Sequence, residues 1–331
     1  MDEIETVYAP ERVRPSYSRT GWALFAILGI TTVLQLAGAA VAYQLAPQLY
    51  STSWFTWVMT FAPLYIIAIP VGYLIIRPAP KMIVPQEKLS IGKLFAFVAM
   101  SFAIMYIGNI IGTLLNAGIS ALRGTATTNP LTMMMTGANV YAEILVVCIC
   151  APVVEELVFR KLLLDRIREY GEGTAILISG LTFGLFHGNL FQFFYAFGLG
   201  ALFAYVYLRT GRLRYPIILH VIINTYGTIQ SRLLTNPDTG VMNTQNTQDL
   251  ISQIQGNLPH FIGVALCSLI GIALFITGIV LLIKNRKKAV LFPAPKELPK
   301  GGRFKAIFIN WGMGLYTLLA LGLIVYMVFG V

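Results

Sequence analysis

The sequence predicts an all-α fold, a polytopic transmembrane helical bundle of about nine spans, and three observations support this class. Of the 331 residues, 56% are hydrophobic and only 11% are charged, whereas soluble domains carry about 25% charged residues. Long runs without a charged residue recur along the chain, and the first, Gly21–Ile76, is long enough for two spanning helices. Basic residues gather in alternate segments between these runs. Together these features exclude a soluble enzyme and a disordered protein.

The nine spans are assigned from apolar runs of about 20 residues, because hydrocarbon tolerates only a backbone whose hydrogen bonds are satisfied internally. We predict spans near residues 21–44, 54–76, 94–118, 138–160, 174–190, 193–208, 214–232, 260–283 and 307–330.

The distribution of basic residues predicts the orientation. The net charge is +10, and 22 of the 24 Lys and Arg residues lie in alternate segments, namely 1–20, 77–93, 160–173, 209–214 and 284–305. Positive charge marks the cytoplasmic side, so we expect a cytoplasmic N-terminus and a C-terminus outside. The charge is then an orientation signal, and we expect no nucleic-acid partner.

The chain divides into three parts. Residues 1–137 hold the N-terminal tail and the first three spans, and residues 138–233 are the predicted core. Residues 234–331 hold the rest of a polar outer loop (233–259), the eighth span, a basic cytoplasmic linker (284–305) and the ninth span.

Ionisable groups inside spans are costly and usually functional, and few are found here. They are Glu143, Glu155, Glu156, His187 and His220, with Arg160 at a span end. Glu143 lies near the outer end of its span, where we expect an interfacial acid.

Helical spacing relates these residues to one another. Glu156 and Arg160 are one turn apart and can pair as a structural ion pair, while Glu155 points about 100° away. Phe183 and His187 share one face of their helix. His220 and Asn224 likewise share a face, so they present an imidazole and an amide to one neighbour.

The depths of these residues can be compared by counting from the turn at Gly171. Glu155 lies 16 residues before this turn and His187 lies 16 residues after it. In an antiparallel helix pair the two side chains are level. His220 and Asn224 align less well: reflection through turns near residues 191 and 211 places Asn224 close to the level of Phe183 and leaves a mismatch of about one to two turns for helix tilt to absorb. A cluster of one acid, two histidines and one amide within the bilayer is geometrically possible.

Such a cluster favours hydrolysis. A carboxylate can take a proton from water, a histidine beside it can orient that water, and an amide with a second imidazole can stabilise the oxyanion. No serine or cysteine is placed with a histidine as a nucleophile pair. We predict no cofactor, although two histidines and a glutamate could hold zinc.

Three short motifs resemble those of the CAAX-protease and bacteriocin-processing (CPBP, or Abi) family of intramembrane proteases, and its Rce1-like members in particular. The motifs are EExxxR at Glu155, Glu156 and Arg160, FxxxH at Phe183 and His187, and HxxxN at His220 and Asn224. The resemblance covers residues 138–228 and implies a helical core that opens toward the cytosol.

The resemblance also implies roles for the residues. Glu155 would be the general base, His187 would position the water, and His220 and Asn224 would stabilise the oxyanion. The remaining motif residues, Glu156, Arg160 and Phe183, would support the site.

Membrane lipid and a peptide or membrane-protein substrate, either a prenylated CAAX-like tail or a leader peptide, are the expected partners. We expect a multi-pass integral protein of a bacterial-type cell membrane. Three alternatives stay open: a zinc-dependent protease, a non-catalytic binding or immunity protein with this fold, and a transporter or proton relay.

Overall fold

The computed structural model describes residues 10–135, 139–234, 254–294 and 296–329, and within these ranges it contains helices and no strand. The two ends of the chain and most of the predicted outer loop 233–259 lie outside the described residues. The principal helices are α1 (Pro10–Leu45), α2 (Ser53–Ala62), η2 (Pro63–Ala68), α3 (Ile69–Ile76), α4 (Ile91–Arg123), α9 (Glu172–Phe186), α10 (Leu190–Thr210), α11 (Arg214–Leu234), α13 (Leu258–Asn285) and α15 (Trp311–Phe329).

Each predicted span coincides with one of these helices or with a helical run between residues 140 and 170. Six of the described helical segments are long and apolar enough to cross a membrane: α1, the continuous α2–η2–α3 segment, α4, α10, α13 and α15. The protein is therefore a multi-pass integral membrane protein. The other three predicted spans, the 140–170 run, α9 and α11, carry the polar residues of the candidate site.

The 140–170 run alternates between α-helical and π-helical turns. Its elements are α6 (Val140–Glu143), η3 (Ile144–Cys150), α7 (Ala151–Glu156), η4 (Leu157–Leu164), α8 (Asp165–Ile167) and η5 (Arg168–Tyr170), of which η3 and η4 are π-helical. Pro152, at the start of α7, has no backbone N–H, so the backbone hydrogen-bond pattern of η3 is interrupted there. Glu155 and Glu156 thus occupy the last turn of α7, between two π segments, and π turns occur frequently at functional sites.

Helices α9 and α10 form a tightly packed antiparallel pair. Gly188, with a φ of 62°, forms the turn between the two helices. The Asn189 side chain caps α10, because its Oδ1 accepts a hydrogen bond from the backbone N–H of Gln192 at 2.9 Å. A Cβ atom added at Gly184 would lie 2.8 Å from the carbonyl oxygen of Phe193. Only glycine allows the two backbones to approach this closely, and this contact fixes the end of α9 that carries His187.

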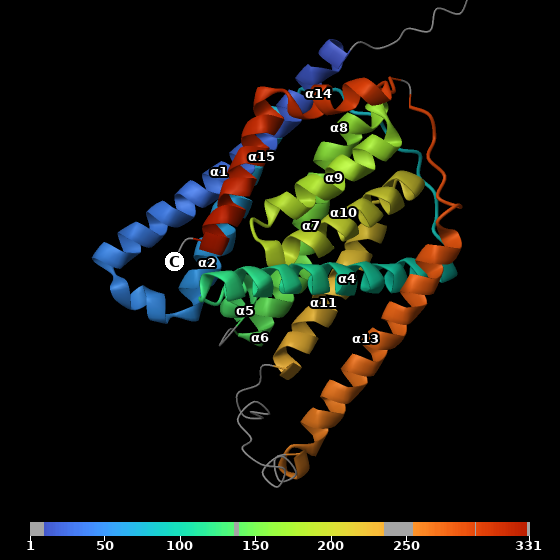
Figure 1. Ribbon diagram of the computed structural model, residues 1–331. Coiled ribbons are helices and arrows are strands. Elements are labelled where there is room, and N and C mark those ends of the chain that lie inside the picture. The colour runs from blue at the N-terminus through green and yellow to red at the C-terminus, as the bar shows by residue number, and fades with distance from the viewer. Residues whose placement is uncertain (1–9, 136–138, 235–253, 295, 330–331) are drawn as a thin grey trace, which may run out of the picture.

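The last helix, α15, is an integral part of the bundle. It runs beside α1, while α4 lies across α10 and α13 (Figure 1). A Cβ atom at Gly21 of α1 would collide with the backbone of Gly312 and Met313. The Tyr316 hydroxyl donates to the carbonyl of Thr182 in α9 at 2.6 Å, so α15 also supports the helix that carries Phe183.

Backbone contacts gather the predicted cytoplasmic segments at one end of the bundle. Segment 77–93 is hydrogen-bonded to two other segments at this end. The backbone N–H of Met82 donates to the carbonyl of Asp165, and the backbone N–H of Glu87 donates to the carbonyl of Thr210 at the end of α10. The hydroxyls of Ser16 and Tyr170 are 2.8 Å apart. Arg123, one of the two basic residues outside these segments, donates to the carbonyl of Val328 near the end of α15. The basic segments therefore share one end of the bundle, as the positive-charge pattern predicts.

Part of the predicted linker 284–305 is bound to the bundle. We call its residues 286–294 and 296–299 the strap. The backbone N–H groups of Lys296 and Leu298 donate to the carbonyls of Glu169 and Tyr170, and the Leu298 side chain is buried. After the strap, η8 (Lys300–Gly302) and α14 (Arg303–Phe308) lead into α15.

Candidate active site

The site is built on a buried ion pair within the 140–170 run. Arg160 Nε lies 2.7 Å from Glu156 Oε2, and Arg160 Nη2 lies 3.1 Å from Glu156 Oε1, so the guanidinium binds the carboxylate in a bidentate manner. Both side chains are fully buried. The third donor, Arg160 Nη1, bonds to the hydroxyl of Ser179 on α9 at 2.8 Å. A buried pair is stable only when its remaining polar atoms find partners, and here α9 supplies one.

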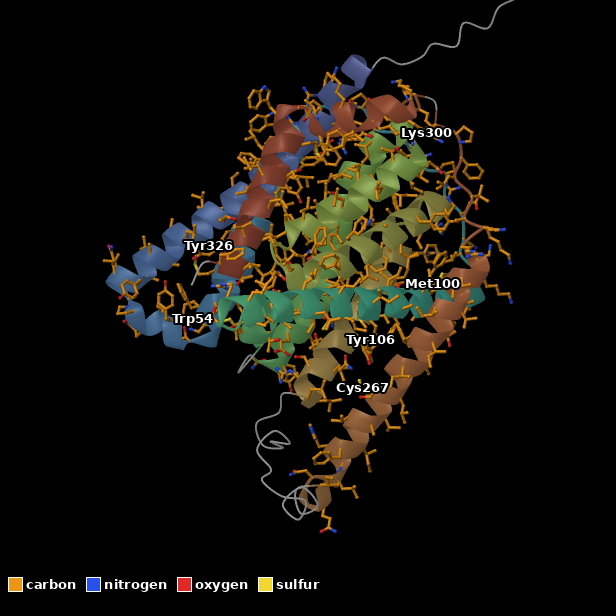
Figure 2. The ribbon with its side chains drawn as sticks, viewed as in Figure 1. Trp54, Met100, Tyr106, Cys267, Lys300 and Tyr326 are labelled. Atoms are coloured by element: carbon orange, nitrogen blue, oxygen red, sulfur yellow. The ribbon has the colours of Figure 1, made fainter. Side chains whose placement is uncertain are left out.

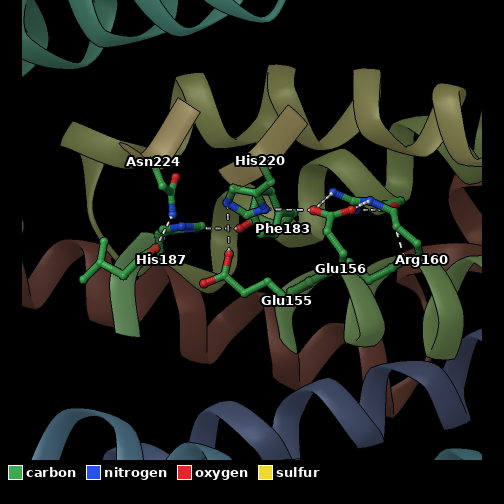
Figure 3. Close-up of polar contacts among 10 residues, drawn as sticks. Glu155, Glu156, Arg160, Phe183, His187, His220 and Asn224 are labelled. Atoms are coloured by element: carbon green, nitrogen blue, oxygen red, sulfur yellow. Dashed lines mark hydrogen bonds and ion pairs between the residues drawn. The ribbon is translucent and has the colours of Figure 1, made fainter. Parts of the chain in front are cut away.

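His220 of α11 lies between the two adjacent glutamates (Figure 3). Its Nδ1 is 3.0 Å from Glu156 Oε1, and its Nε2 is 3.6 Å from Glu155 Oε2. Because a carboxylate only accepts hydrogen bonds, the network assigns the proton of Nδ1 to the bond with Glu156. This bond fixes the ring so that Nε2 faces Glu155, whose side chain is 19% exposed.

His187 occupies the C-cap of α9 and turns its ring toward the same space as Glu155 (Figure 3). Its Nδ1 lies 2.9 Å from the carbonyl oxygen of Phe183, one turn earlier. Since a carbonyl only accepts, Nδ1 donates, and in the neutral form of the ring Nε2 is the acceptor nitrogen. Nε2 is available to accept a hydrogen bond from a water molecule.

Asn224 contacts the same helical run as His220, but at a different turn. Its Nδ2 donates to the carbonyl of Val147 in η3 at 2.9 Å. The prediction that His220 and Asn224 face one neighbouring helix is correct, although the two side chains meet different residues of it. One N–H of the amide is committed to Val147, and the second N–H is left for another acceptor.

Phe183 joins these groups through its ring. It is buried, its centroid lies 5.0 Å from that of His187 and 5.7 Å from that of His220, and both contacts are edge-to-face. The guanidinium carbon of Arg160 lies 5.2 Å from the same centroid, as in a cation–π contact. The ring therefore touches all three motifs and fills the space between them.

Several residues around the site were not predicted from the sequence. Ser179 lies one turn before Phe183 on the same helix face, so helical spacing could have indicated it. The ring of Phe203 packs 5.5 Å from His220. Tyr65 of η2 and Tyr195 of α10 are close enough to interact electrostatically with Glu155. These aromatic residues come from helices without a motif, so no sequence signal indicated them.

Glu143 requires a correction. We predicted an interfacial acid, but the side chain is fully buried and its Oε2 pairs with Arg232 at the end of α11. The fourth and seventh predicted spans approach each other there, and their charged residues neutralise one another. Glu143 is three turns from Glu155 along the run and does not belong to the site cluster.

The fit of a zinc ion can be tested on the donor atoms. Two ligands of a tetrahedral zinc are about 3.3 Å apart, given Zn–N and Zn–O bonds of about 2.0–2.1 Å. The 3.6 Å between Glu155 Oε2 and His220 Nε2 is close to that value. However, in the described part of the chain no three His, Cys, Asp or Glu side chains are grouped for metal binding. We therefore derive no step through a metal.

Comparison with protein families finds a match for the segment that carries the site. Residues 137–226 match the family of type II CAAX prenyl endopeptidase Rce1-like proteins. The matched segment contains all three motifs, from Glu155 to Asn224.

Two curated bacterial proteins are similar to the chain. The putative membrane peptidase YdiL of Bacillus subtilis (strain 168) is 33% identical over 106 residues, which are 32% of this chain and 42% of that protein. The membrane-embedded CAAX protease MroQ of Staphylococcus aureus (strain USA300) is 36% identical over 100 residues, which are 28% of this chain and 39% of that protein. The chain thus spans about two fifths of each relative. No solved structure matches it at a significant level.

Proposed function

Because residues 137–226 match the Rce1-like family, we propose that the chain is an intramembrane endopeptidase that uses glutamate- and histidine-activated water. The observation that carries this proposal is the contrast between two adjacent acids. Glu156 is fully buried and neutralised by Arg160, whereas Glu155 is partly exposed beside His220 and His187. Glu156 suits a structural role, and Glu155 is free to act on water.

The first step is attack by water. Glu155 takes a proton from a water molecule that also donates to Nε2 of His187, and the oxygen of that water bonds to the scissile carbonyl carbon. The bond from His187 Nδ1 to the Phe183 carbonyl holds the imidazole in the tautomer that this step needs. Partial exposure of Glu155 allows water to reach it.

The second step is collapse of the tetrahedral intermediate. The free N–H of Asn224 and a protonated Nε2 of His220 would donate to the oxyanion. The carbon–nitrogen bond then breaks, and the proton held by Glu155 passes to the leaving amine. The products are a carboxylic acid and an amine, the acid's proton then passes to the amine to give a carboxylate and an ammonium group, and the atoms balance without a covalent enzyme intermediate.

The substrate class follows from the position of the site. Glu155, His187 and His220 lie on helices that pack against candidate membrane spans, among them α4, α10 and α15, so we expect a substrate peptide that is associated with the membrane. A CAAX-like prenylated tail and a leader peptide both have this property. The family description and the name of the Staphylococcus relative favour the CAAX-like tail.

The proposal is tested by Glu155→Gln with Glu297→Gln as a matched control, since Glu297 is an exposed acid of the strap. Peptide termini in cells that carry each variant are compared with wild type by mass spectrometry. We expect a set of cleaved termini to disappear with Glu155→Gln and to persist with Glu297→Gln. If all termini persist with Glu155→Gln while the variant is folded and present in the membrane, the protease proposal is wrong.

A further inference from the structure

A cavity lies apart from the candidate active site. It has a volume of about 1140 Å³ and is bounded by α4, α10, α13 and the strap. Its lining includes none of the seven motif residues. Arg209 and Thr210 mark its position at the end of the bundle where the basic segments gather.

The polar part of this cavity is strongly basic. Two acids, Glu87 and Glu172, line it together with six basic residues, Lys88, Lys93, Arg168, Arg209, Arg286 and Lys288. Because the rest of the lining is apolar, such an excess of positive charge favours an anionic ligand.

Two arginines of this lining each have two donors without an acceptor in the described structure. The Arg168 side chain is only 10% exposed, yet its Nε and Nη1 have no hydrogen-bond partner among the described residues, and its Nη2 is 3.9 Å from Glu172 Oε1. Arg209 also has two buried donors, Nε and Nη1, without partners in the described structure. Buried donors are normally satisfied, so these guanidinium groups indicate a missing acceptor.

Glu172 does not accept from these four donors in the described structure. Its Oε2 accepts from Arg209 Nη2 and, at 2.9 Å, from the backbone N–H of Phe292 in the strap. One carboxylate thus serves two guanidinium groups and a strap amide. The buried cluster of Arg168, Arg209 and Glu172 retains one positive charge.

The other walls of the cavity are apolar and come from membrane-spanning helices. Phe97 and Met100 of α4, Leu202 of α10 and Leu282 of α13 line it. Figure 2 shows Met100 on the part of α4 that lies toward α13. A ligand that fills the cavity must therefore combine an anionic group with a hydrocarbon part.

We propose that this cavity binds one anionic phospholipid, with the phosphate at Arg168 and Arg209 and an acyl chain along Met100 and Leu282. Arg donors match the geometry of phosphate oxygens, and basic pockets between spanning helices on the cytoplasmic side recognise anionic headgroups. The strap closes over the headgroup, because Phe292 of the strap stacks on Arg209, with the guanidinium carbon 4.4 Å from the ring centroid. The site is independent of the proposed proteolysis.

The test is native mass spectrometry of the full chain in detergent with added dioleoyl phosphatidylglycerol or dioleoyl phosphatidylcholine. We expect one phosphatidylglycerol to be retained at concentrations where phosphatidylcholine is not. Arg168→Gln should weaken this binding about tenfold, as expected for the loss of hydrogen bonds to a charged group. Lys300→Gln is the matched control, because Lys300 is an exposed basic residue at the same end, outside the cavity lining (Figure 2).

Two further measurements complete the test. Lys288→Gln changes an exposed residue of the cavity rim, and it should weaken phosphatidylglycerol binding even if Arg168→Gln fails to fold. Inorganic phosphate is the second probe. Equal binding of the two lipids, or an equal loss with Lys300→Gln, overturns the proposal. So does stabilisation by inorganic phosphate that equals stabilisation by phosphatidylglycerol.

Discussion

His220 Nδ1 lies 3.0 Å from Glu156 Oε1, so the carboxylate that neutralises Arg160 also holds the imidazole that faces Glu155. One buried acid thereby links two helices, the 140–170 run and α11. Because Glu156 is shielded from water, it orients and polarises His220 but does not itself exchange a proton with the attacking water. Glu156 is a positioning residue in the proposed mechanism.

Removing both members of the buried ion pair should cost less than the sum of the two single removals. Arg160→Met leaves the Glu156 carboxylate buried without its main partner, and we expect a loss of about 3–5 kcal/mol in the free energy of unfolding. Glu156→Leu should cost a similar amount, because it leaves Arg160 charged and buried. The double variant should lose clearly less than the sum, as measured by denaturant unfolding in detergent. Additive losses would show that the two charges do not stabilise one another.

His187→Asn should separate catalysis from stability. An asparagine amide can still donate to the Phe183 carbonyl, but it has no nitrogen equivalent to Nε2 to orient water. We expect proteolysis to fall about 10²–10⁴-fold, the usual range for loss of a proton-transfer group, with little change in unfolding temperature. His187→Ala is the comparison, since it removes both functions. Normal turnover by His187→Asn would exclude His187 from the reaction.

The close approach of α9 and α10 can be tested with two glycines. In Gly184→Ala the new methyl group would lie 2.8 Å from the Phe193 carbonyl oxygen, and overpacking of this kind costs about 1–3 kcal/mol. Gly227→Ala, in α11, is the matched control, because no atom lies within 4 Å of the added Cβ. It should be neutral or stabilising by up to about 1 kcal/mol through helix propensity. Thermal unfolding of the two variants gives the comparison, and equal melting temperatures would contradict the tight crossing.

The motif pairs were predictable from the sequence because they are local. An i,i+4 spacing fixes Glu156 against Arg160 and Phe183 against His187 whatever surrounds them, and apolar runs fix the helices themselves. Counting from Gly171 also brought Glu155 level with His187, since an antiparallel pair has one register. The structure agrees with each of these.

Interactions between distant segments were not predictable in the same way. The Glu143–Arg232 pair joins residues 89 positions apart, and nothing in either local pattern selects the partner. The π-helical turns on either side of Glu155 depend on how the 140–170 run packs, because an apolar sequence is compatible with both the α-helical and the π-helical hydrogen-bond pattern. The strap is bound through backbone N–H groups, which every residue except proline possesses, so its composition suggested only a linker.

The strap should be released when its anchor is removed. Glu172→Gln weakens both the bond to Arg209 and the acceptor of the Phe292 amide, so local opening of residues 286–294 becomes easier. We expect trypsin to cleave after Lys287 and Lys288 several-fold faster than in the wild type. Glu87→Gln is the control, because it removes the same charge from an exposed residue of the same cavity. If both variants are cleaved at the wild-type rate, Glu172 does not hold the strap.

Removal of metal ions distinguishes the proposed mechanism from a zinc-dependent one. In the water mechanism, the proton acceptor, the water-orienting imidazole and the oxyanion donors are all side chains, so activity should persist after dialysis against EDTA and 1,10-phenanthroline. A zinc mechanism would instead need Glu155, His187 and His220 as ligands, and loss of the metal would abolish turnover. Cleavage of a membrane-associated peptide is followed before and after chelation, then after addition of stoichiometric Zn²⁺. If activity disappears after chelation and is restored by zinc alone, the metal-free mechanism is wrong, and Glu155 is a zinc ligand rather than the base.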